Sequence, residues 1–313
     1  MGVSHSAHYY VAQAVRDGAD LAQLHCIVTG ASSGIGLETA RALAEGGAHV
    51  VMACRNVSKA KKCIEAMHGQ GDFKNNLSVM QVDLESFASV KTFATEFLAT
   101  GKPLNLLVCN AGYFMMTHET TADGYEKTFQ TCHLSHYLLF RLLQDKLVAS
   151  APSRVVMVAS TVYRTAPSDW DWPDAAKGQL GFGSASIAGF PAYGRAKLAN
   201  IHMAQYIAET LGPKGVRAFA VHPGGVDTSI YPWWTKPLMK TILLSPGQGA
   251  APTMLCAISK QAAAGDATEA PYYEAGASGY TAPALTSLTK FAANKDNMRR
   301  LAQESETIIK AYL

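Results

Sequence analysis

Short apolar runs alternate with helix-like segments along most of this 313-residue chain, and this alternation limits its possible folds more than any other feature. Seven runs have the length of buried strands: His25–Thr29, Val50–Ala53, Leu77–Val82, Leu104–Cys109, Val155–Ala159, Val216–Val221 and Pro271–Tyr273. Continuous apolar runs of this kind are typical of parallel strands that are covered on both faces. The sequence therefore predicts an α/β fold, a Rossmann-type doubly wound parallel sheet of about seven strands with helices on both faces.

Nothing in the composition divides the chain into separate units. We find no repeat, low-complexity linker or composition break, so we expect one domain over residues 24–313 after an N-terminal extension over residues 1–23. Long helices are expected over Thr121–Val148 and from about Ala192 to Gly212.

The overall composition narrows the class of function. A hydrophobic fraction of 48% is typical of a globular protein, and a formal charge of +3 is too small to indicate a nucleic-acid partner. We find no signal-peptide pattern and no apolar run of about 18 residues, so we expect no transmembrane segment and a cytoplasmic location. The six cysteines include no Cys-x-x-Cys pair, which indicates buried thiols. The first residues, from Met1 to Ser6, match the loose pattern for N-myristoylation of Gly2, but a chance match is the simpler interpretation.

A glycine-rich turn joins the first predicted strand to the first predicted helix. Its three glycines allow the backbone to turn tightly and to approach a pyrophosphate, whose charge is stabilised by the N-terminus of the helix. A turn that binds nothing is the alternative, but the position between strand and helix favours dinucleotide binding. The residues assigned to this contact are Thr29, Gly30, Ser32, Ser33, Gly34, Ile35 and Gly36.

The end of the second strand predicts which dinucleotide is bound. A site selective for NAD(H) usually has an acid here that binds the ribose hydroxyls, and the stretch Met52–Asn56 contains none. Arg55 instead offers a guanidinium for a 2′-phosphate. The sequence therefore favours NADP(H), with an arginine that only solvates the strand end as the alternative.

Other strand ends carry residues suited to the rest of the cofactor. A carboxylate after the third strand can reach adenine, small residues after the fourth let the backbone approach a ribose, and a bend after the sixth can wrap a nicotinamide. The residues in these positions are Asp83, Leu84, Asn110, Ala111, Gly112, Pro223, Gly224, Val226 and Thr228. Each is also compatible with an ordinary turn or helix cap.

Tyr193 and Lys197 form the candidate catalytic pair. Four residues apart on a helix, they lie on one face, and an ammonium beside a phenol lowers the phenol pKa from its usual value near ~10. Ser160 closes the fifth strand, and its hydroxyl can donate to a substrate carbonyl oxygen. The three residues predict a hydride-transfer site in which Tyr193 is the acid/base and Lys197 also binds the nicotinamide ribose.

Together these motifs resemble the short-chain dehydrogenase/reductase family over about residues 24–280. Thr29, Gly30, Gly34 and Gly36 match its glycine motif, and Ser160, Tyr193 and Lys197 match its catalytic residues. The long interval between Ser160 and Tyr193 is similar to the subgroup of WW domain-containing oxidoreductases, retinol dehydrogenases and protochlorophyllide reductases. The resemblance implies an NADP(H)-dependent oxidoreductase, and relatives that form dimers make a homodimer the expected assembly if there is one.

One position departs from the family pattern. The subgroup motif looks like Asn-His-Leu-Gly-His, whereas this chain has Cys132 in place of the asparagine, followed by His133 and His136. In the family that asparagine orders a water that leads to the lysine, so the proton relay is in question. The relatives carry both histidines too, so we expect no metal site here.

The segments that flank the catalytic residues indicate an apolar substrate. Aromatic and aliphatic residues occur at Asp169–Trp172, Gly181–Phe190, Tyr231–Trp234 and Leu238–Leu244. We therefore expect transfer of hydride between NADP(H) and the carbonyl or alcohol of a small lipophilic substrate such as a steroid or retinoid. The alternatives are reduction of a C=C bond on the same scaffold, and a cofactor-binding regulatory protein with weakened catalysis.

Overall fold

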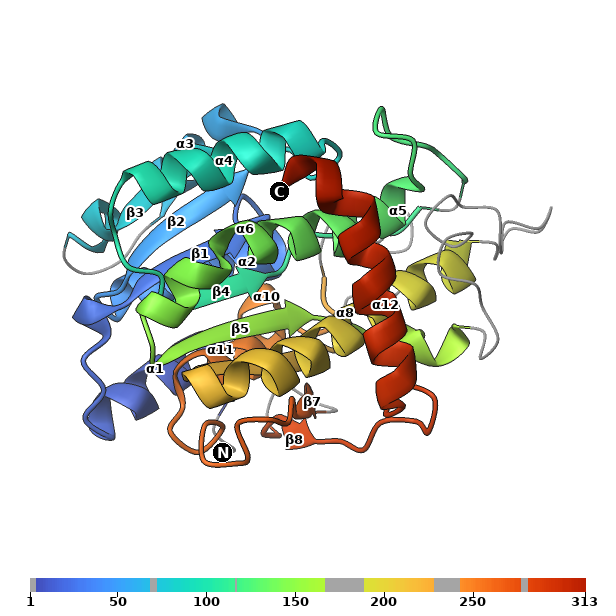
Figure 1. Ribbon diagram of the computed structural model, residues 1–313. Helices are drawn as coiled ribbons and strands as arrows, with labels where there is room; N and C mark the ends of the chain where they lie inside the picture. The colour runs from blue at the N-terminus through green and yellow to red at the C-terminus, as the bar shows by residue number, and fades with distance from the viewer. Residues whose placement is uncertain (1–3, 68–71, 116, 167–188, 228–242, 277–280) are drawn as a thin grey trace.

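The predicted parallel sheet forms the centre of the molecule (Figure 1). The computed structural model describes residues 4–67, 72–115, 117–166, 189–227, 243–276 and 281–313. The strands are β1 His25–Thr29, β2 His49–Cys54, β3 Leu77–Gln81, β4 Leu106–Cys109, β5 Ser153–Val158, β6 Val216–His222, β7 Tyr272–Glu274 and β8 Ala284–Leu285. Their order in the sheet is β3-β2-β1-β4-β5-β6-β7-β8, and all neighbours pair in parallel except β7 and β8.

The strand order creates a topological switch beside β1. The chain adds β2 and β3 on one side of β1 and then crosses to β4 on the other side. At such a switch the loops after neighbouring strands diverge, which opens a crevice at the carboxyl ends of β1 and β4. The glycine-rich turn and Asn110 both lie at these ends.

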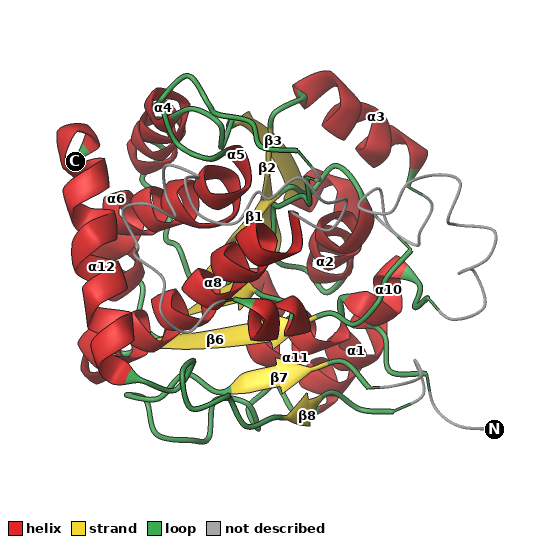
Figure 2. Ribbon diagram, turned by 90° about the vertical axis from the view of Figure 1, so that its right-hand side faces the viewer, coloured by secondary structure: helices red, strands yellow, loops and turns green. Residues whose placement is uncertain are grey.

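Helices cover both faces of the sheet (Figure 2). The helices are α1 Ala7–Arg16, α2 Gly34–Glu45, α3 Val57–Ala66, α4 Phe87–Ala99, α5 Lys127–Phe129, α6 Ser135–Ala149, α8 Gly189–Leu211, α10 Pro246–Gly249, α11 Ala251–Ile258 and α12 Lys295–Ile309. One buried cluster joins the sheet to α4, α6 and α8, and α12 packs across the outside of this layer. The other cluster joins the opposite face to α1, α2 and α11.

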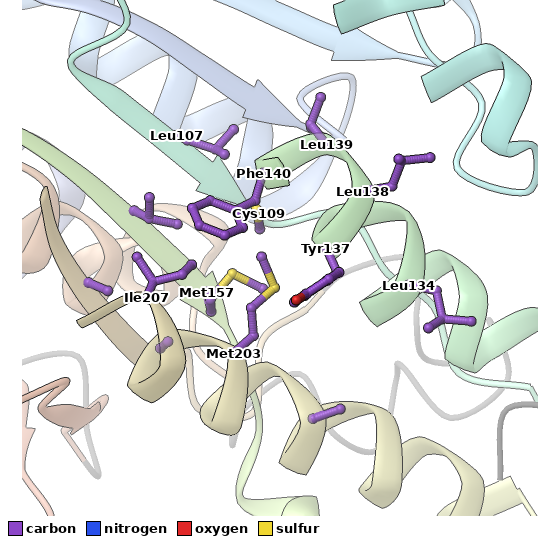
Figure 3. Packing of buried hydrophobic residues seen from close by; sticks show 14 of the residues in the cluster. Leu107, Cys109, Leu134, Tyr137, Leu138, Leu139, Phe140, Met157, Met203 and Ile207 are labelled. Atoms are coloured by element: carbon purple, nitrogen blue, oxygen red, sulfur yellow. The ribbon is translucent and has the colours of Figure 1, made fainter. Parts of the chain in front are cut away.

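The core between the sheet and α6 shows why these segments form the fold they do (Figure 3). Leu107 and Cys109 on β4 face Phe140 on α6, and Met157 on β5 faces Met203 on α8. All five side chains are essentially inaccessible to solvent. Burial of continuous apolar runs on both faces of the strands is the reason that the sheet is parallel and central.

The structure differs from the sequence prediction in several places. An eighth, antiparallel strand of two residues, β8, pairs with β7 at the edge, and it is too short to leave an apolar run. The helix expected from Thr121 begins only at Lys127, because Thr120 and Glu126 pair around Gly124 and the Glu126 carboxylate caps the helix. A π-helical turn, Gln130–Leu134, then precedes α6, and the C-terminal helix α12 is an addition to the expected helices.

The segment set apart as an N-terminal extension contains α1. Ala7, Tyr10 and Ala14 on this helix are buried in the cluster that also contains residues of α2 and α11.

Among the described helices, none combines the length and apolar character needed to cross a membrane.

Two helical leucines test this description of the core. Leu139 on α6 is fully buried, whereas Leu98 on α4 is 38% exposed. We expect Leu139→Ala to lower the free energy of unfolding by about 2–5 kcal/mol, because it leaves a cavity. Leu98→Ala should cost less than about 1 kcal/mol. Urea unfolding of both variants measures the difference, and equal losses would contradict the assignment of Leu139 to the core.

Candidate functional site

A cavity of about 940 Å³ opens at the carboxyl ends of the strands on both sides of the switch. Nearly all predicted site residues line it: Gly30, Ser32, Ser33, Gly34, Ile35, Gly36, Arg55, Asp83, Leu84, Asn110, Ala111, Gly112, Ser160, Tyr193, Lys197, Pro223, Gly224 and Val226. Thr29 does not line the cavity because it is buried beneath the turn. Thr228 lies outside the described residues, as do most of the segments predicted to contact substrate.

The glycine-rich turn has the geometry of a phosphate loop. Gly30 and Gly34 have φ angles of 67° and 57°, which favour glycine. A Cβ atom on Gly36 would lie 2.4 Å from Asn110 Nδ2, so only glycine allows the helix to pack this closely on the end of β4. Ser33 makes no side-chain cap on α2, so the first N–H groups of this 12-residue helix are left for an anion.

The Thr29 hydroxyl joins the glycine turn to the end of β4. Its oxygen accepts the N–H groups of Asn110 and Ala111, each at 2.9 Å. Having accepted two bonds, it donates to His136 Nε2, also at 2.9 Å, and His136 Nδ1–H in turn donates to the Cys132 carbonyl at 3.0 Å. Because burial lowers the pKa of His136 to about 4, the imidazole is neutral, as this arrangement requires.

An ion-pair cluster occupies the end of the cavity where an adenosine would bind. Arg55 Nη1 donates to Glu85 Oε1 at 2.7 Å, and Lys127 Nζ lies 3.2 Å from Glu85 Oε2. Asp83 Oδ1 accepts the backbone N–H of Glu85 at 3.0 Å, which holds the turn after β3. The guanidinium predicted to bind a 2′-phosphate is therefore paired with a carboxylate from the turn that follows the neighbouring strand, β3.

The catalytic candidates lie at the other end of the cavity. Ser160 Oγ accepts the N–H of Val162 at 3.3 Å, so its own proton remains to be donated into the cavity. Lys197 Nζ lies 5.4 Å from the centre of the Tyr193 ring. The Tyr193 ring meets the Phe114 ring edge-on, with 5.6 Å between the ring centres. The Phe114 ring also packs on the Phe190 ring, with 4.8 Å between their centres.

Lys197 is buried among polar partners. Nζ donates to the Val158 carbonyl at 2.8 Å, an oxygen that also accepts from Asn200 Nδ2 at 3.3 Å. Burial lowers the pKa of Lys197. Because an ammonium has three protons, two remain after the bond to Val158 and can serve Tyr193 and a ribose.

The bend after β6 closes the cavity beside Lys197. Gly224 has a φ of 81°, and a Cβ atom there would lie 2.8 Å from Leu244. Val226 pairs with Leu244 as a parallel bridge. The bend therefore favours glycine for its backbone conformation, and a larger residue would also displace the end of the Leu244 side chain.

Cys132 is fully buried beside Lys197. A Cβ atom placed on Gly112 would lie 2.9 Å from Cys132 Sγ and 3.4 Å from Lys197 Nζ, so both groups border the same point. The thiol makes a long contact, 3.8 Å, as donor to the Tyr113 carbonyl. Burial raises the pKa of the thiol, which keeps it protonated. The Cys132 side chain thus contacts the loop after β4 and lacks the side-chain amide of the family asparagine.

The histidines beside Cys132 have structural partners. His133 Nε2 lies 3.0 Å from Ser305 Oγ on α12, and His136 bonds Thr29 and Cys132 as described. Among the described residues, no group of three or more His, Cys, Asp or Glu side chains could hold a metal ion.

The six cysteines are all free thiols, and five of them are buried, with Cys63 partly exposed.

Three residues of the site are absent from the sequence prediction. Glu85 is two residues after Asp83, in the turn that follows the third strand. The acid that selects the cofactor is expected at the end of the second strand, so the sequence provides no reason to assign Glu85. The sequence presents His136 only as a possible metal ligand, and no local motif indicates its bond to a threonine 107 positions away. Phe114 is two residues after Gly112, which is the one signal for its place in the cavity.

Comparisons with known proteins agree with this geometry. A family model described as short chain dehydrogenase matches residues 24–178, and one described as Enoyl-(Acyl carrier protein) reductase matches residues 181–236. The chain is 37% identical to retinol dehydrogenase 11 of Mus musculus over 75% of this chain and 73% of that protein. The chain therefore belongs to the short-chain dehydrogenase/reductase family, a family of oxidoreductases.

Two further likenesses are consistent with this family. It is 41% identical to the WW domain-containing oxidoreductase of Danio rerio over 78% of this chain, but it spans only 60% of that relative's length. The structure of a short chain dehydrogenase from Burkholderia cenocepacia in complex with NADP matches with a TM-score of 0.63 and 21% identity, and covers 83% of this chain and 99% of the other. At that identity the second likeness concerns the fold.

The buried histidines predict how stability depends on pH. Burial lowers the pKa of His136, His202 and His222 from 6.5 to about 4. Between these values the unfolded chain binds more protons than the folded one, so the free energy of unfolding should fall as the pH drops from 6.5 towards 4.

Urea unfolding at pH 7.5 and pH 5 measures this fall. A His202→Leu variant, which removes one such group, should show a smaller difference between the two pH values. Equal stability of the unchanged chain at both values would contradict the burial of these histidines in the neutral form.

Proposed function

We propose that this chain is an NADP(H)-dependent oxidoreductase that transfers hydride between the nicotinamide and a carbonyl or alcohol of a small apolar substrate. The observation that supports this most is that Ser160, Tyr193 and Lys197 line the same cavity as the glycine-rich turn. A phosphate loop brings a dinucleotide to the cavity, and the three side chains supply acid/base chemistry at its far end.

The residues of the cavity fit such a cofactor. The uncapped N-terminus of α2 and the glycines before it suit a pyrophosphate, and Arg55 suits a 2′-phosphate. Asn110 and Ala111 line the cavity where a ribose would bind, and the Thr29 hydroxyl holds their backbone. The NADP complex of the Burkholderia cenocepacia protein supports the choice of cofactor by analogy of fold. When bound, the nicotinamide supplies or accepts the hydride.

The protein side chains manage the proton and the charge. The Ser160 hydroxyl donates a hydrogen bond to the substrate oxygen, which stabilises negative charge as the carbonyl is reduced. Tyr193 gives its phenolic proton to that oxygen, and takes it back in the reverse direction. The Lys197 ammonium favours the phenolate that this leaves, which is why a buried lysine lies beside the ring.

The wall next to Tyr193 supports an apolar substrate. Phe114 and Phe190 contact each other and lie in the cavity beside the reacting end. Aromatic side chains of this kind bind apolar surfaces and leave orientation to a few polar groups, here Ser160 and Tyr193. A steroid, a retinoid or another lipophilic carbonyl has this character.

Cys132 favours a second candidate function, a cofactor-binding regulatory protein with weakened catalysis. The thiol is directed to the Tyr113 carbonyl, and the Cys132 carbonyl already accepts a bond from His136. Both features leave Lys197 with fewer groups that could order a water.

A Cys132→Asn variant separates the two functions. A rise in kcat of more than about tenfold would favour the weakened catalyst, whereas rapid reduction of carbonyls by the unchanged chain would favour the first function.

Replacing the phenol tests the proposed acid. We expect Tyr193→Phe to lower kcat for lipophilic carbonyls by about 10²–10⁴-fold, because the proton donor is lost, while NADPH affinity changes little. Tyr206→Phe, on the same helix but outside the cavity lining, is the matched control and should retain activity. Absorbance of the nicotinamide follows turnover. Full activity in Tyr193→Phe would exclude the proposed mechanism.

Replacing the guanidinium tests the choice of cofactor. We expect the unchanged chain to bind NADPH more tightly than NADH, and Arg55→Met to weaken NADPH about tenfold or more with little effect on NADH, because a charge-assisted contact to the phosphate is lost. Arg16→Met on α1 is the control. Fluorescence titration of both cofactors on all three proteins gives the dissociation constants, and tighter binding of NADH than NADPH by the unchanged chain would contradict the role of Arg55.

A further inference from the structure

Glu85 brings a carboxylate to the end of β2 from outside that strand. The residue follows β3, and its side chain lines the cavity together with Arg55. An acid at the end of β2 normally favours NAD(H), and an arginine favours NADP(H). This cavity holds both groups, in contact with each other.

The turn after β3 keeps Glu85 in place. Asp83 Oδ1 accepts the Glu85 N–H at 3.0 Å, and the Asp83 N–H donates to Ser89 Oγ at 2.9 Å. Ser86, the next residue, caps α4 by accepting the N–H of Ser89. The backbone of Glu85 is thus held on both sides, so its carboxylate has a restricted range of positions.

The carboxylate contacts two cations that differ in exposure. Arg55 lies 2.7 Å from Oε1 and its side chain is 65% exposed, whereas Lys127 lies 3.2 Å from Oε2 and is 24% exposed. Lys127 also contacts Glu119 at 3.1 Å. Arg55 can therefore turn away into the cavity, and Glu85 then keeps Lys127 as its partner.

We propose that Glu85 is a specificity-determining residue, which competes with the 2′-phosphate of the cofactor for Arg55 and so reduces the preference for NADP(H) over NAD(H). This inference rests on the proposed function. A phosphate and a carboxylate beside one guanidinium repel each other, so binding of NADP(H) requires Arg55 to leave Glu85. NAD(H) has no 2′-phosphate and leaves the Arg55–Glu85 pair intact.

Neutralising the carboxylate tests the competition. Fluorescence titration of NADPH and NADH is carried out on the unchanged chain and on Glu85→Gln and Glu85→Ala, each checked for folding by thermal unfolding. We expect both variants to bind NADPH about three- to tenfold more tightly, with NADH changed less than about twofold. Adenosine 2′,5′-bisphosphate, which lacks the nicotinamide, should show the same gain in a competition assay.

Glu119→Gln is the matched control. Glu119 also contacts Lys127, but it contacts neither Arg55 nor the cavity, so the ratio of the two dissociation constants should stay at the value of the unchanged chain. A ratio that is unchanged in both Glu85 variants would overturn the proposal, as would equal tightening of NADPH and NADH. If the unchanged chain binds neither cofactor, the proposed function fails and this inference with it.

Discussion

The hydroxyl of Thr29 is the contact on which the rest of the site depends. The Thr29 oxygen accepts two backbone N–H groups from the end of β4, and its hydroxyl donates to His136 on α6. The glycine turn, the end of β4 and the segment with Cys132 are thus joined at one hydroxyl. This arrangement requires a neutral His136, because Nε2 must accept the Thr29 proton while Nδ1–H donates to the Cys132 carbonyl. Loss of one bond would therefore disturb both the cofactor end and the catalytic end.

Much of this arrangement can be predicted from the sequence, because it depends on strand ends. In a parallel sheet the carboxyl ends of all strands meet at one edge, so residues such as Gly30, Asn110 and Ser160 are brought together once their strands are recognised. Helical spacing puts Tyr193 and Lys197 on one face of a helix, and the motifs at the strand ends and the family resemblance single out this pair. For this reason the amino-acid sequence is sufficient to predict the fold and most of the residues that line the cavity.

The remaining features depend on side chains that meet across elements, and these leave no local pattern. The Arg55–Glu85 pair joins residues 30 positions apart, and the bond between Thr29 and His136 spans 107. The π-helical turn at Gln130–Leu134 cannot be distinguished from an α-helix by its apolar spacing. Thr228 and most of the predicted substrate segments lie outside the described residues, so those assignments stay predictions.

The position of α12 has a consequence for the segment that contains Cys132. Ser305 on α12 bonds His133, the neighbour of Cys132, while Glu306 pairs with Arg141 on α6 through both carboxylate oxygens. The last helix, α12, thus stabilises the position of the segment that borders Lys197. Changes on the outer surface of α12, far along the chain from any motif, can therefore reach the reacting end by altering how firmly that segment is held.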